Sequence, residues 1–502
     1  MGESKKLAVS ASSRVAVDTF AGRVHVEWDP DAAVTPFGQL PFFIEFLKAS
    51  GLYDAFVSDC PLRYTSPNAP NVRDILGTLL LSILAGHRRY AHITTIRTDR
   101  VNPELLGMEG VASEDSVRRA LSQFDEAEAV AWLDRHLASC THPLLSLGSW
   151  VLDTDNTVKP LYGKQEGAVK SYNPKKRGRP SHSYHSYFMG NTRMALGVEV
   201  EPGNRHTGSH VAAGLWRLLD SMPKNIWPAF IRGDVSFGSE GIMRQAEERE
   251  LHYLTKLRLS KNVRKVIDRM IDRGEWEDAG QGFRGAETTL QLTGWTKRRR
   301  VIVLKRLIQG DILLTSDQLE LAFIETGDGV RKYEYQVLVT SMPDEILTIA
   351  QLYRDRGDSE NCFDELKNQW GWGGFTTQDI QRCRVISRMI ALVYNWWSLY
   401  TRLLNPDKRH EAITSRPLML QSVGRKTTHA GQTVVTITSS HAKSSVIQRA
   451  MQELTTFFKE LSHTAEQLGI AERVRVIALK AFRKLLAAPP PVPLQKLLPE
   501  PG

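Results

Sequence analysis

Residues 150–158, Trp150-Val-Leu-Asp-Thr-Asp-Asn-Thr-Val158, decide the fold class of this 502-residue chain. Upstream, from about residue 36, apolar residues recur at helical spacing, and at Leu147 the pattern changes to that of strands. Residues 150–158 are therefore predicted to form the first strand of a sheet. Asp153 and Asp155 share one face of it, because strand side chains alternate. Two carboxylates on a core strand are costly to bury without a cation beside them, and a metal ion would meet that cost.

Downstream residues alternate between strand and helix patterns. Strands are predicted at residues 185–190, 194–200, 228–234 and 252–257, and helices at 209–221 and 239–250. This order is typical of an α/β domain in which helices cover a mixed sheet. Functional side chains of such sheets gather at strand ends, and Asp234 ends its predicted strand. The alternative for a single strand-end Asp is a helix cap or turn residue.

A β-rich insertion follows, because residues from about 276 to 342 again alternate like strands. Helix resumes at Pro343 and is predicted to continue through the stretch that ends at residue 367. One face of this helix would carry side chains of both charge signs, namely Tyr353, Arg356, Glu360, Asp364 and Lys367. Charges at this spacing most often form a solvated, ion-paired face. The alternative is that the face contributes side chains to a catalytic site.

The charge of the chain is mildly positive, with 65 Lys and Arg against 56 Asp and Glu, a net charge of +9. This balance fits a polyanionic partner without requiring one. Basic residues concentrate in a loop after the first strand and in the insertion. We expect phosphate contacts from Lys175, Lys176, Arg177 and Arg179 in the loop and from Arg298, Arg299 and Arg300 in the insertion. The alternative for the loop is simple solvation.

The four cysteines are far apart and include no Cys-x-x-Cys pair, so neither a disulfide scaffold nor a zinc site is indicated. The longest apolar run, residues 75–86, is shorter than the roughly 20 residues that a membrane span needs. The N-terminus lacks the apolar segment of an export signal. We expect a soluble cytoplasmic protein without a membrane partner.

The spacing Tyr-x2-Arg-x3-Glu-x6-Lys is met by Tyr353, Arg356, Glu360 and Lys367. Four further motifs accompany it: Leu152-Asp-Thr-Asp-Asn-Thr157, residues 163–168, Tyr172-Asn-Pro174 and Arg232-Gly-Asp-Val-Ser-Phe237. With these motifs the chain resembles DDE transposases of bacterial insertion sequences, in the insertion sequence 1380 family, over about residues 145–405. The resemblance implies an α/β fold with an RNase H-like catalytic core, a β-rich insertion, and helical regions on either side.

The resemblance also assigns the site by position. Asp155, Asp234 and Glu360 would be the catalytic acids and would hold Mg²⁺, with Mn²⁺ as a substitute and two ions expected. Asp153 remains an alternative to Asp155. Tyr353, Arg356 and Lys367 would contact DNA near the scissile phosphate. Paired hard cations of this kind stabilise the attacking and leaving oxygens of phosphoryl transfer.

The implied function is a transposase that binds the terminal inverted repeats of double-stranded DNA, cleaves at the element ends and joins them to target DNA. A homodimer on DNA and a cut-and-paste route follow from the resemblance. Two rivals are a structure-selective nuclease without strand transfer and a catalytically inactive DNA-binding protein. An enzyme of small phosphates is disfavoured, because the basic runs and the insertion would serve no purpose there.

The expected organisation has seven parts. They are an N-terminal arm (1–35), a helical DNA-binding region (36–144), the first part of the core (145–258), the insertion (259–343), the second part of the core (344–405), a C-terminal helical region (406–488) and a Pro-rich tail (489–502). For the region 36–144 the alternative is an all-helical packing domain. Residues 406–445 are predicted to be mostly loop with a short strand at 434–438, and residues 446–486 one long helix.

Overall fold

The computed structural model describes residues 14–487, except 30, 65, 67, 172, 174–175, 206–207, 274, 309–321, 325–331, 439–440, 442 and 465–467. The predicted Pro-rich tail, 489–502, lies outside this part of the chain. Among the described residues, no helix combines the length and the apolar character that crossing a membrane requires.

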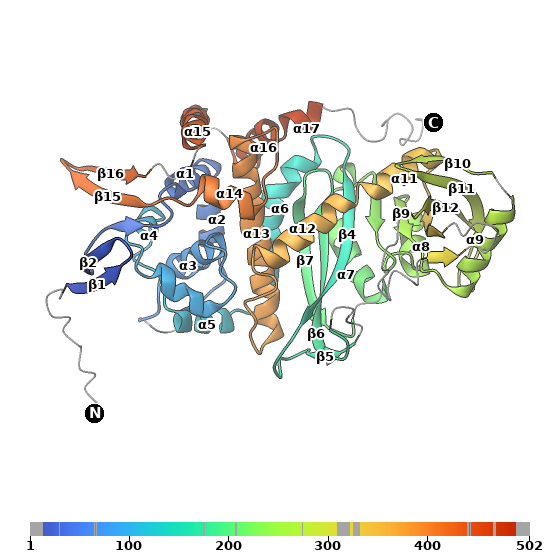
Figure 1. Cartoon of the computed structure of the whole chain (residues 1–502), viewed down its shortest axis with the longest axis horizontal. Helices are drawn as coiled ribbons and strands as arrows, with labels where there is room; N and C mark the ends of the chain where they lie inside the picture. The colour runs from blue at the N-terminus through green and yellow to red at the C-terminus, as the bar shows by residue number, and fades with distance from the viewer. Residues whose placement is uncertain are drawn as a thin grey trace.

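The α/β sheet predicted from the strand order is confirmed, and the core consists of five strands of the large sheet. Its strands are β4 (Val151–Pro160), β6 (Pro180–Met189), β7 (Met194–Pro202), β8 (Phe230–Gly233) and β9 (His252–Lys256). They lie in the order β7-β6-β4-β8-β9 (Figure 1). β6 is antiparallel to β4 and β7, whereas β8 is parallel to β4 and β9. This is the RNase H-like sheet order. The short β5 (Val169–Lys170) lies beside β6.

Helices connect the parallel strands. α7 (Gly208–Asp220) precedes β8, and α8 (Glu240–Glu248) joins β8 to β9. A short 3₁₀ helix, η2 (Lys224–Ile226), lies between α7 and β8. Such crossovers bury both faces of a parallel sheet, which explains why β8 is buried along its whole length.

The insertion predicted from the second region of alternation is β-rich and begins with α9 (Lys261–Arg273). Its strands are β10 (Glu277–Gly280), β11 (Phe283–Leu290), β12 (Arg299–Leu307), β13 (Ala322–Ile324) and β14 (Lys332–Thr340). β14 pairs antiparallel with β9. The insertion therefore continues the core sheet instead of forming a separate one, and it occupies one end of the molecule (Figure 1).

The single helix predicted from Pro343 to residue 367 is wrong in one respect. Two helices, α11 (Ile346–Arg354) and α12 (Gly357–Asn368), meet at a turn that includes Asp355 and Arg356. Gly357 starts the second helix, and glycine weakens a helix interior. After the Gly-Trp-Gly-Gly break at residues 371–374, the apolar pattern predicts a long helix over residues 380–404. It is confirmed as α13 (Ile380–Leu404), which is buried over nearly all its length.

The helical pattern predicted before residue 145 is confirmed. The helices are α1 (Leu40–Ser50), α2 (Leu52–Ser58), α3 (Val72–Leu84), the 3₁₀ helix η1 (Tyr90–Ile96), α4 (Asn102–Leu105), α5 (Glu114–Ser122) and α6 (Glu126–Leu145). They share one hydrophobic core with α13, for example through Phe43, whose ring lies 5.3 Å from those of Trp397 and Tyr400. Packing thus accounts for the apolar residues of this region, and its contact with DNA stays a prediction.

Residues 406–445 are more ordered than predicted. They contain α14 (Ala412–Met419) and a hairpin of β15 (Gly424–His429) and β16 (Gln432–Ile437), which pairs with β3 (Val34–Thr35). The single long helix predicted after them is also wrong. The described residues of this region form three helices, α15 (Ser444–Thr464), α16 (Ile470–Ala481) and α17 (Arg483–Ala487). A new helix begins at α16, where Glu472 accepts a hydrogen bond from the Gly469 backbone.

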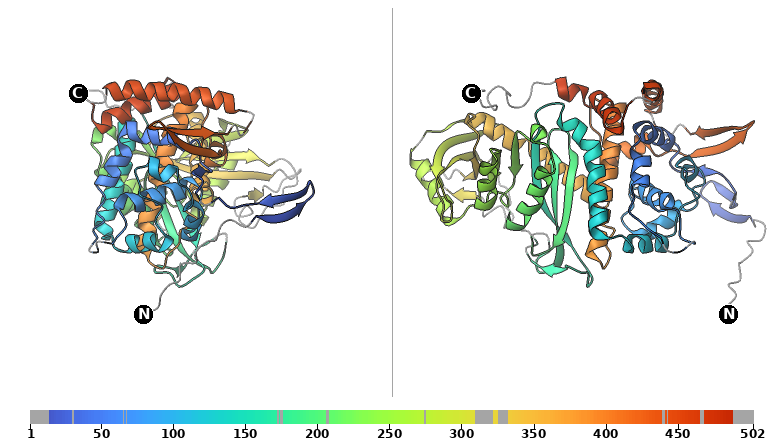
Figure 2. Two further views of the ribbon diagram at one scale, coloured as in Figure 1. Left: turned by 90° about the vertical axis from the view of Figure 1, so that its left-hand side faces the viewer. Right: turned by 180° about the vertical axis from the view of Figure 1, so that it is seen from behind.

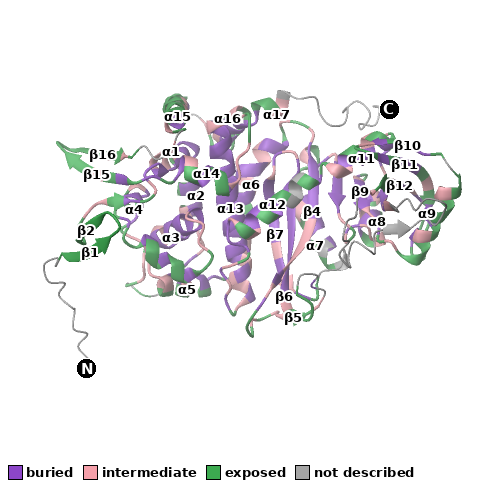
Figure 3. Ribbon diagram, viewed as in Figure 1, coloured by how far each residue is buried: buried purple, intermediate pink, exposed green. Residues whose placement is uncertain are grey.

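In the N-terminal arm, the alternation at residues 13–18 and 23–28 predicts a strand pair. This pair is confirmed as β1 (Val15–Thr19) and β2 (Gly22–Val26). This hairpin and the β15–β16 hairpin both project at the end of the molecule opposite the insertion (Figure 2). The central strands and α13 are mostly buried, whereas both projecting hairpins are largely exposed (Figure 3).

Candidate active site

Asp153 is buried in β4 and is neutralised by an arginine. Its carboxylate accepts hydrogen bonds from Nε and Nη2 of Arg232 on β8, at 2.5 and 2.7 Å. Both side chains are less than 5% exposed. Arg232 Nη1 also donates to the Leu352 carbonyl of α11. This bidentate pair joins the two acid-bearing strands to the helix that precedes α12. Arg232 also supplies the cation that the sequence analysis expected beside the buried carboxylate of Asp153.

Asp155 lies two residues further along β4, on the same face and closer to solvent, with a side chain that is 18% exposed. In the parallel register of β4 and β8, Thr154 stands opposite Gly233. The next residues in the two chains are Asp155 and Asp234. Asp155 lies within β4, whereas Asp234 is the first residue after β8. Aligned residues of neighbouring strands point to the same face, so the register brings these two backbone positions next to each other.

The N-terminus of α12 lies over Asp155. Arg356, which caps the helix and is 7% exposed, places Nη2 at 3.2 Å from Oδ2 of Asp155. At the other end of α12, Nζ of Lys367 donates to the Val158 carbonyl of β4 at 3.4 Å. Glu360 belongs to the first turn of α12, between these two contacts, and its side chain lies outside the described part of the structure.

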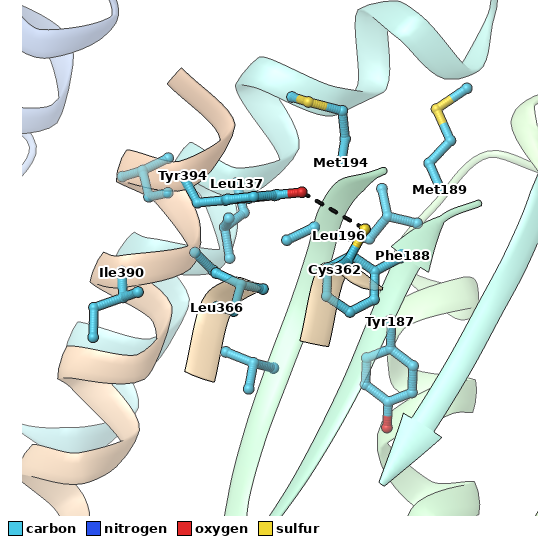
Figure 4. Packing of buried hydrophobic residues seen from close by; sticks show 14 of the residues in the cluster. Leu137, Tyr187, Phe188, Met189, Met194, Leu196, Cys362, Leu366, Ile390 and Tyr394 are labelled. Carbon is cyan, nitrogen blue, oxygen red and sulfur yellow. Dashed lines mark hydrogen bonds between the residues drawn. The ribbon is translucent and has the colours of Figure 1, made fainter. Parts of the chain in front are cut away.

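Apolar contacts hold α12 in this position. Cys362, Phe363 and Leu366 are buried on its inner face. Figure 4 shows Cys362 and Leu366 packed among residues of β6, β7 and α13, and the Tyr394 hydroxyl of α13 donates to the Cys362 sulfur at 3.7 Å. The outer face is polar, and Asp364 there is exposed and accepts a hydrogen bond from Asn368 at 2.6 Å.

A buried lysine ties β4 to the turn after α12. Nζ of Lys159 donates to the Gly374 carbonyl at 2.5 Å and lies 3.4 Å from the Tyr184 hydroxyl. Burial lowers the pKa of Lys159 from 10.5 to about 8, and Cys383 acts in the opposite direction. Both ends of α12 are therefore attached to β4 through cationic side chains.

The donor set suits a hard divalent cation. Asp155 and Asp234 present carboxylate oxygens, which Mg²⁺ and Mn²⁺ prefer, and both side chains are partly exposed. Asp234 Oδ1 accepts a hydrogen bond from the Ser236 backbone at 2.9 Å. No group of three or more acidic, His or Cys side chains placed to hold a metal occurs among the described residues. That set does not include the Glu360 side chain.

The predicted phosphate contacts differ in their availability. Lys176, Arg177 and Arg179 are exposed, and Lys176 and Arg179 lie over the Tyr162 ring at 5.0 and 4.7 Å. Lys175 lies outside the described residues. These exposed cations are placed where a phosphate backbone can reach them.

In the insertion, Arg298 is exposed, whereas Arg299 is buried and not available to DNA. Arg299 forms ion pairs with Glu240 at 2.5 Å and Glu247 at 2.8 Å. Arg300 is held by Glu287 at 2.5 Å and by the Met342 carbonyl at 2.6 Å. Strand alternation explains the difference, because it turns Arg299 toward α8.

Arg232 is the site residue that the sequence reasoning left without a role. A signal for it exists in the sequence, since a charged side chain inside a buried strand needs a partner of opposite sign. Asp153, on another predicted strand, is an acid that could have been proposed as the partner of Arg232.

Three comparisons with known proteins bear on this arrangement. A family model described as Transposase DDE domain group 1 matches residues 51–458. No curated protein matches the sequence significantly. A solved structure of the piggyBac transposase synaptic complex with hairpin DNA is 11% identical, with a TM-score of 0.42, and the match covers 88% of this chain and 85% of that chain. At this score the likeness adds nothing to the fold established by the sheet order.

Proposed function

Because the chain belongs to the transposase DDE domain group 1 family, we propose that it cleaves DNA at the ends of an insertion sequence and joins them to target DNA. The observation that best supports this proposal is the parallel register of β4 and β8, in which Thr154 stands opposite Gly233, together with the ion pair between Asp155 and Arg356 at the start of α12. An active transposase of this class needs two adjacent acids and a third from a helix, and Glu360 stands in that helix.

Asp155, Asp234 and Glu360 would hold two Mg²⁺ ions, or Mn²⁺ in their place. When bound, such ions neutralise charge on the phosphate and favour ionisation of the attacking oxygen. The chain itself would supply alignment, because the sheet would fix the first two carboxylates and the packed inner face of α12 would fix the helix that carries the third. Asp153 is the weaker candidate for a ligand, since Arg232 already occupies both of its oxygens.

Arg356 and Lys367 would bind the phosphates on either side of the cut, with Tyr353 beside them. Arg356 already reaches Asp155, so its guanidinium stands at the place where a scissile phosphate would approach the acids. Arginine suits this position because its planar fork matches two phosphate oxygens. Lys175, Lys176, Arg177 and Arg179 would follow the DNA backbone from the loop before β6, and Arg298 would do so from the insertion.

The finer features of the proposal come from the signature of Tyr353, Arg356, Glu360 and Lys367. They are membership of the insertion sequence 1380 group, recognition of terminal inverted repeats, a cut-and-paste route and a homodimer that holds two ends. The protein would act on the chromosome in the cytoplasm. Cutting both ends of an element requires one catalytic site for each DNA end, and two copies of the chain would provide them.

The test is a reaction of the protein with Mg²⁺, labelled terminal-repeat DNA and a supercoiled target. Wild-type protein should give joined products, whereas D155N, D234N and E360Q should lose cleavage by at least about a hundredfold. Asp364→Asn is the matched control, because Asp364 is an exposed acid on the outer face of α12, and it should cleave normally. Cleavage without joining would favour a nuclease, and unchanged activity of E360Q would refute the assignment.

A further inference from the structure

The β15–β16 hairpin is a two-stranded ribbon that the proposed site does not use. Its strands pair in register from Gly424–Ile437 to His429–Gln432. The turn between them has positive φ at both central residues, 49° at Ala430 and 79° at Gly431. Such a turn matches the twist of the strands, so the ribbon is a regular element and not a frayed loop.

The two faces of the ribbon are different. The inward face carries Val435 and Ile437, which line a small cavity with Phe42 and Met451, and Lys426, which forms an ion pair with Glu104. This face is attached to the body of the protein. Because strand side chains alternate, the residues between them point away from the body.

The outward face is polar and basic. It consists of three cross-strand pairs, Arg425 with Thr436, Thr427 with Val434, and His429 with Gln432. All six residues are exposed. Within the described part of the chain, Arg425 makes no ion pair. Val434 is the one apolar residue among them, so this face does not suit an apolar protein partner.

The charge of the segment that contains the ribbon indicates what kind of partner it binds. No Asp or Glu occurs between Glu411 and Glu453, a stretch that includes Arg425, Lys443 and Arg449. The β1–β2 hairpin offers a contrast, because its ion pairs Asp18–Arg23 and Arg14–Glu27 balance its charge. An acid-free ribbon with exposed Arg, Thr, His and Gln side chains complements a polyanion that also offers base edges.

We propose that the outward face of the β15–β16 ribbon binds duplex DNA in a groove. Two strands about 4.8 Å apart fit the B-DNA major groove, which is about 12 Å wide and admits a two-stranded β-ribbon. The ribbon lies at the end of the molecule away from the insertion (Figures 1 and 2). The inference rests on the proposed function and adds to it a DNA contact outside the catalytic core.

The test measures binding of a fluorescein-labelled duplex of about 30 base pairs by fluorescence anisotropy, in EDTA and at several NaCl concentrations. Arg425→Gln should weaken binding about three- to tenfold and lower the slope of log affinity against log salt by about one. Thr436→Glu, which sets an acid opposite Arg425, should weaken binding as well. Arg475→Gln, at an exposed cation of α16, is the matched control and should change neither quantity.

The proposal is overturned if R425Q and T436E bind the duplex as tightly as the control, with the same salt slope. It is also overturned if these variants change the mass of the protein in solution instead, since the ribbon would then be a protein interface. Thermal midpoints equal to that of the wild type show that the variants are folded. Binding is measured without divalent ions, so its outcome is separate from the cleavage test with E360Q.

Discussion

The buried pair of Asp153 and Arg232 gives the sharpest test of how the site is built. Both charges are almost fully removed from water, and each side chain is the other's charge partner. Removing one side chain leaves the other as an unpaired buried charge, which lowers the free energy of unfolding by about 3–5 kcal/mol in buried pairs. We therefore expect R232L and D153L each to lower the free energy of unfolding by about this amount.

The double variant D153L/R232L should be more stable than either single variant, because no buried charge remains unpaired. Its residual loss should be about 1 kcal/mol, the typical worth of the hydrogen bond from Arg232 to the Leu352 carbonyl. Urea denaturation followed by tryptophan fluorescence measures all four proteins of the cycle. Equal stability of D153L and the wild type would refute the reasoning about the pair.

The same variants separate a structural role from a catalytic one. If Asp155 is the ligand, the folded double variant should retain Mg²⁺-dependent DNA cleavage, and D155N should lose it. A folded double variant that is as inactive as D155N would place Asp153 in the metal site and would refute the assignment.

Three further predictions follow from single contacts. Gly190→Ala should cost about 1–3 kcal/mol of stability, because a Cβ there would lie 2.3 Å from Oδ2 of Asp153, and urea denaturation measures it. Raising the pH from 7 to 9 should stabilise the wild type by about 1 kcal/mol relative to Lys159→Met, since the lowered pKa means that the unfolded chain binds more protons in this range. Arg299→Gln should destabilise the protein by about 1–3 kcal/mol, because it removes the ion pairs with Glu240 and Glu247. The slope of log DNA affinity against log salt concentration should stay unchanged in this variant, whereas Arg298→Gln should lower that slope by about one.

The α/β core was predictable because its signals are local. The alternation in residues 150–158 and the strand-end position of Asp234 are properties of neighbouring residues, and they survive in the structure as β4 and β8. Of the β15–β16 hairpin, only a short strand at residues 434–438 was predicted. The first strand and the turn were missed, although Ala430-Gly431 between two alternating stretches is a turn signal. The break before α12 was missed because Gly357 interrupts an otherwise continuous helical pattern.

By itself the sequence determined the order of strands and helices in the α/β core, the acids on its strands, and the spacing of Tyr353, Arg356, Glu360 and Lys367. Only the tertiary structure decided which partner each acid has. Asp153 and Asp155 are residues of one type on one face of β4, but Arg232 of β8 binds Asp153, whereas Arg356 at the start of α12 pairs with Asp155. Register between strands far apart in the chain is set by packing of the whole sheet, so no local pattern contains it.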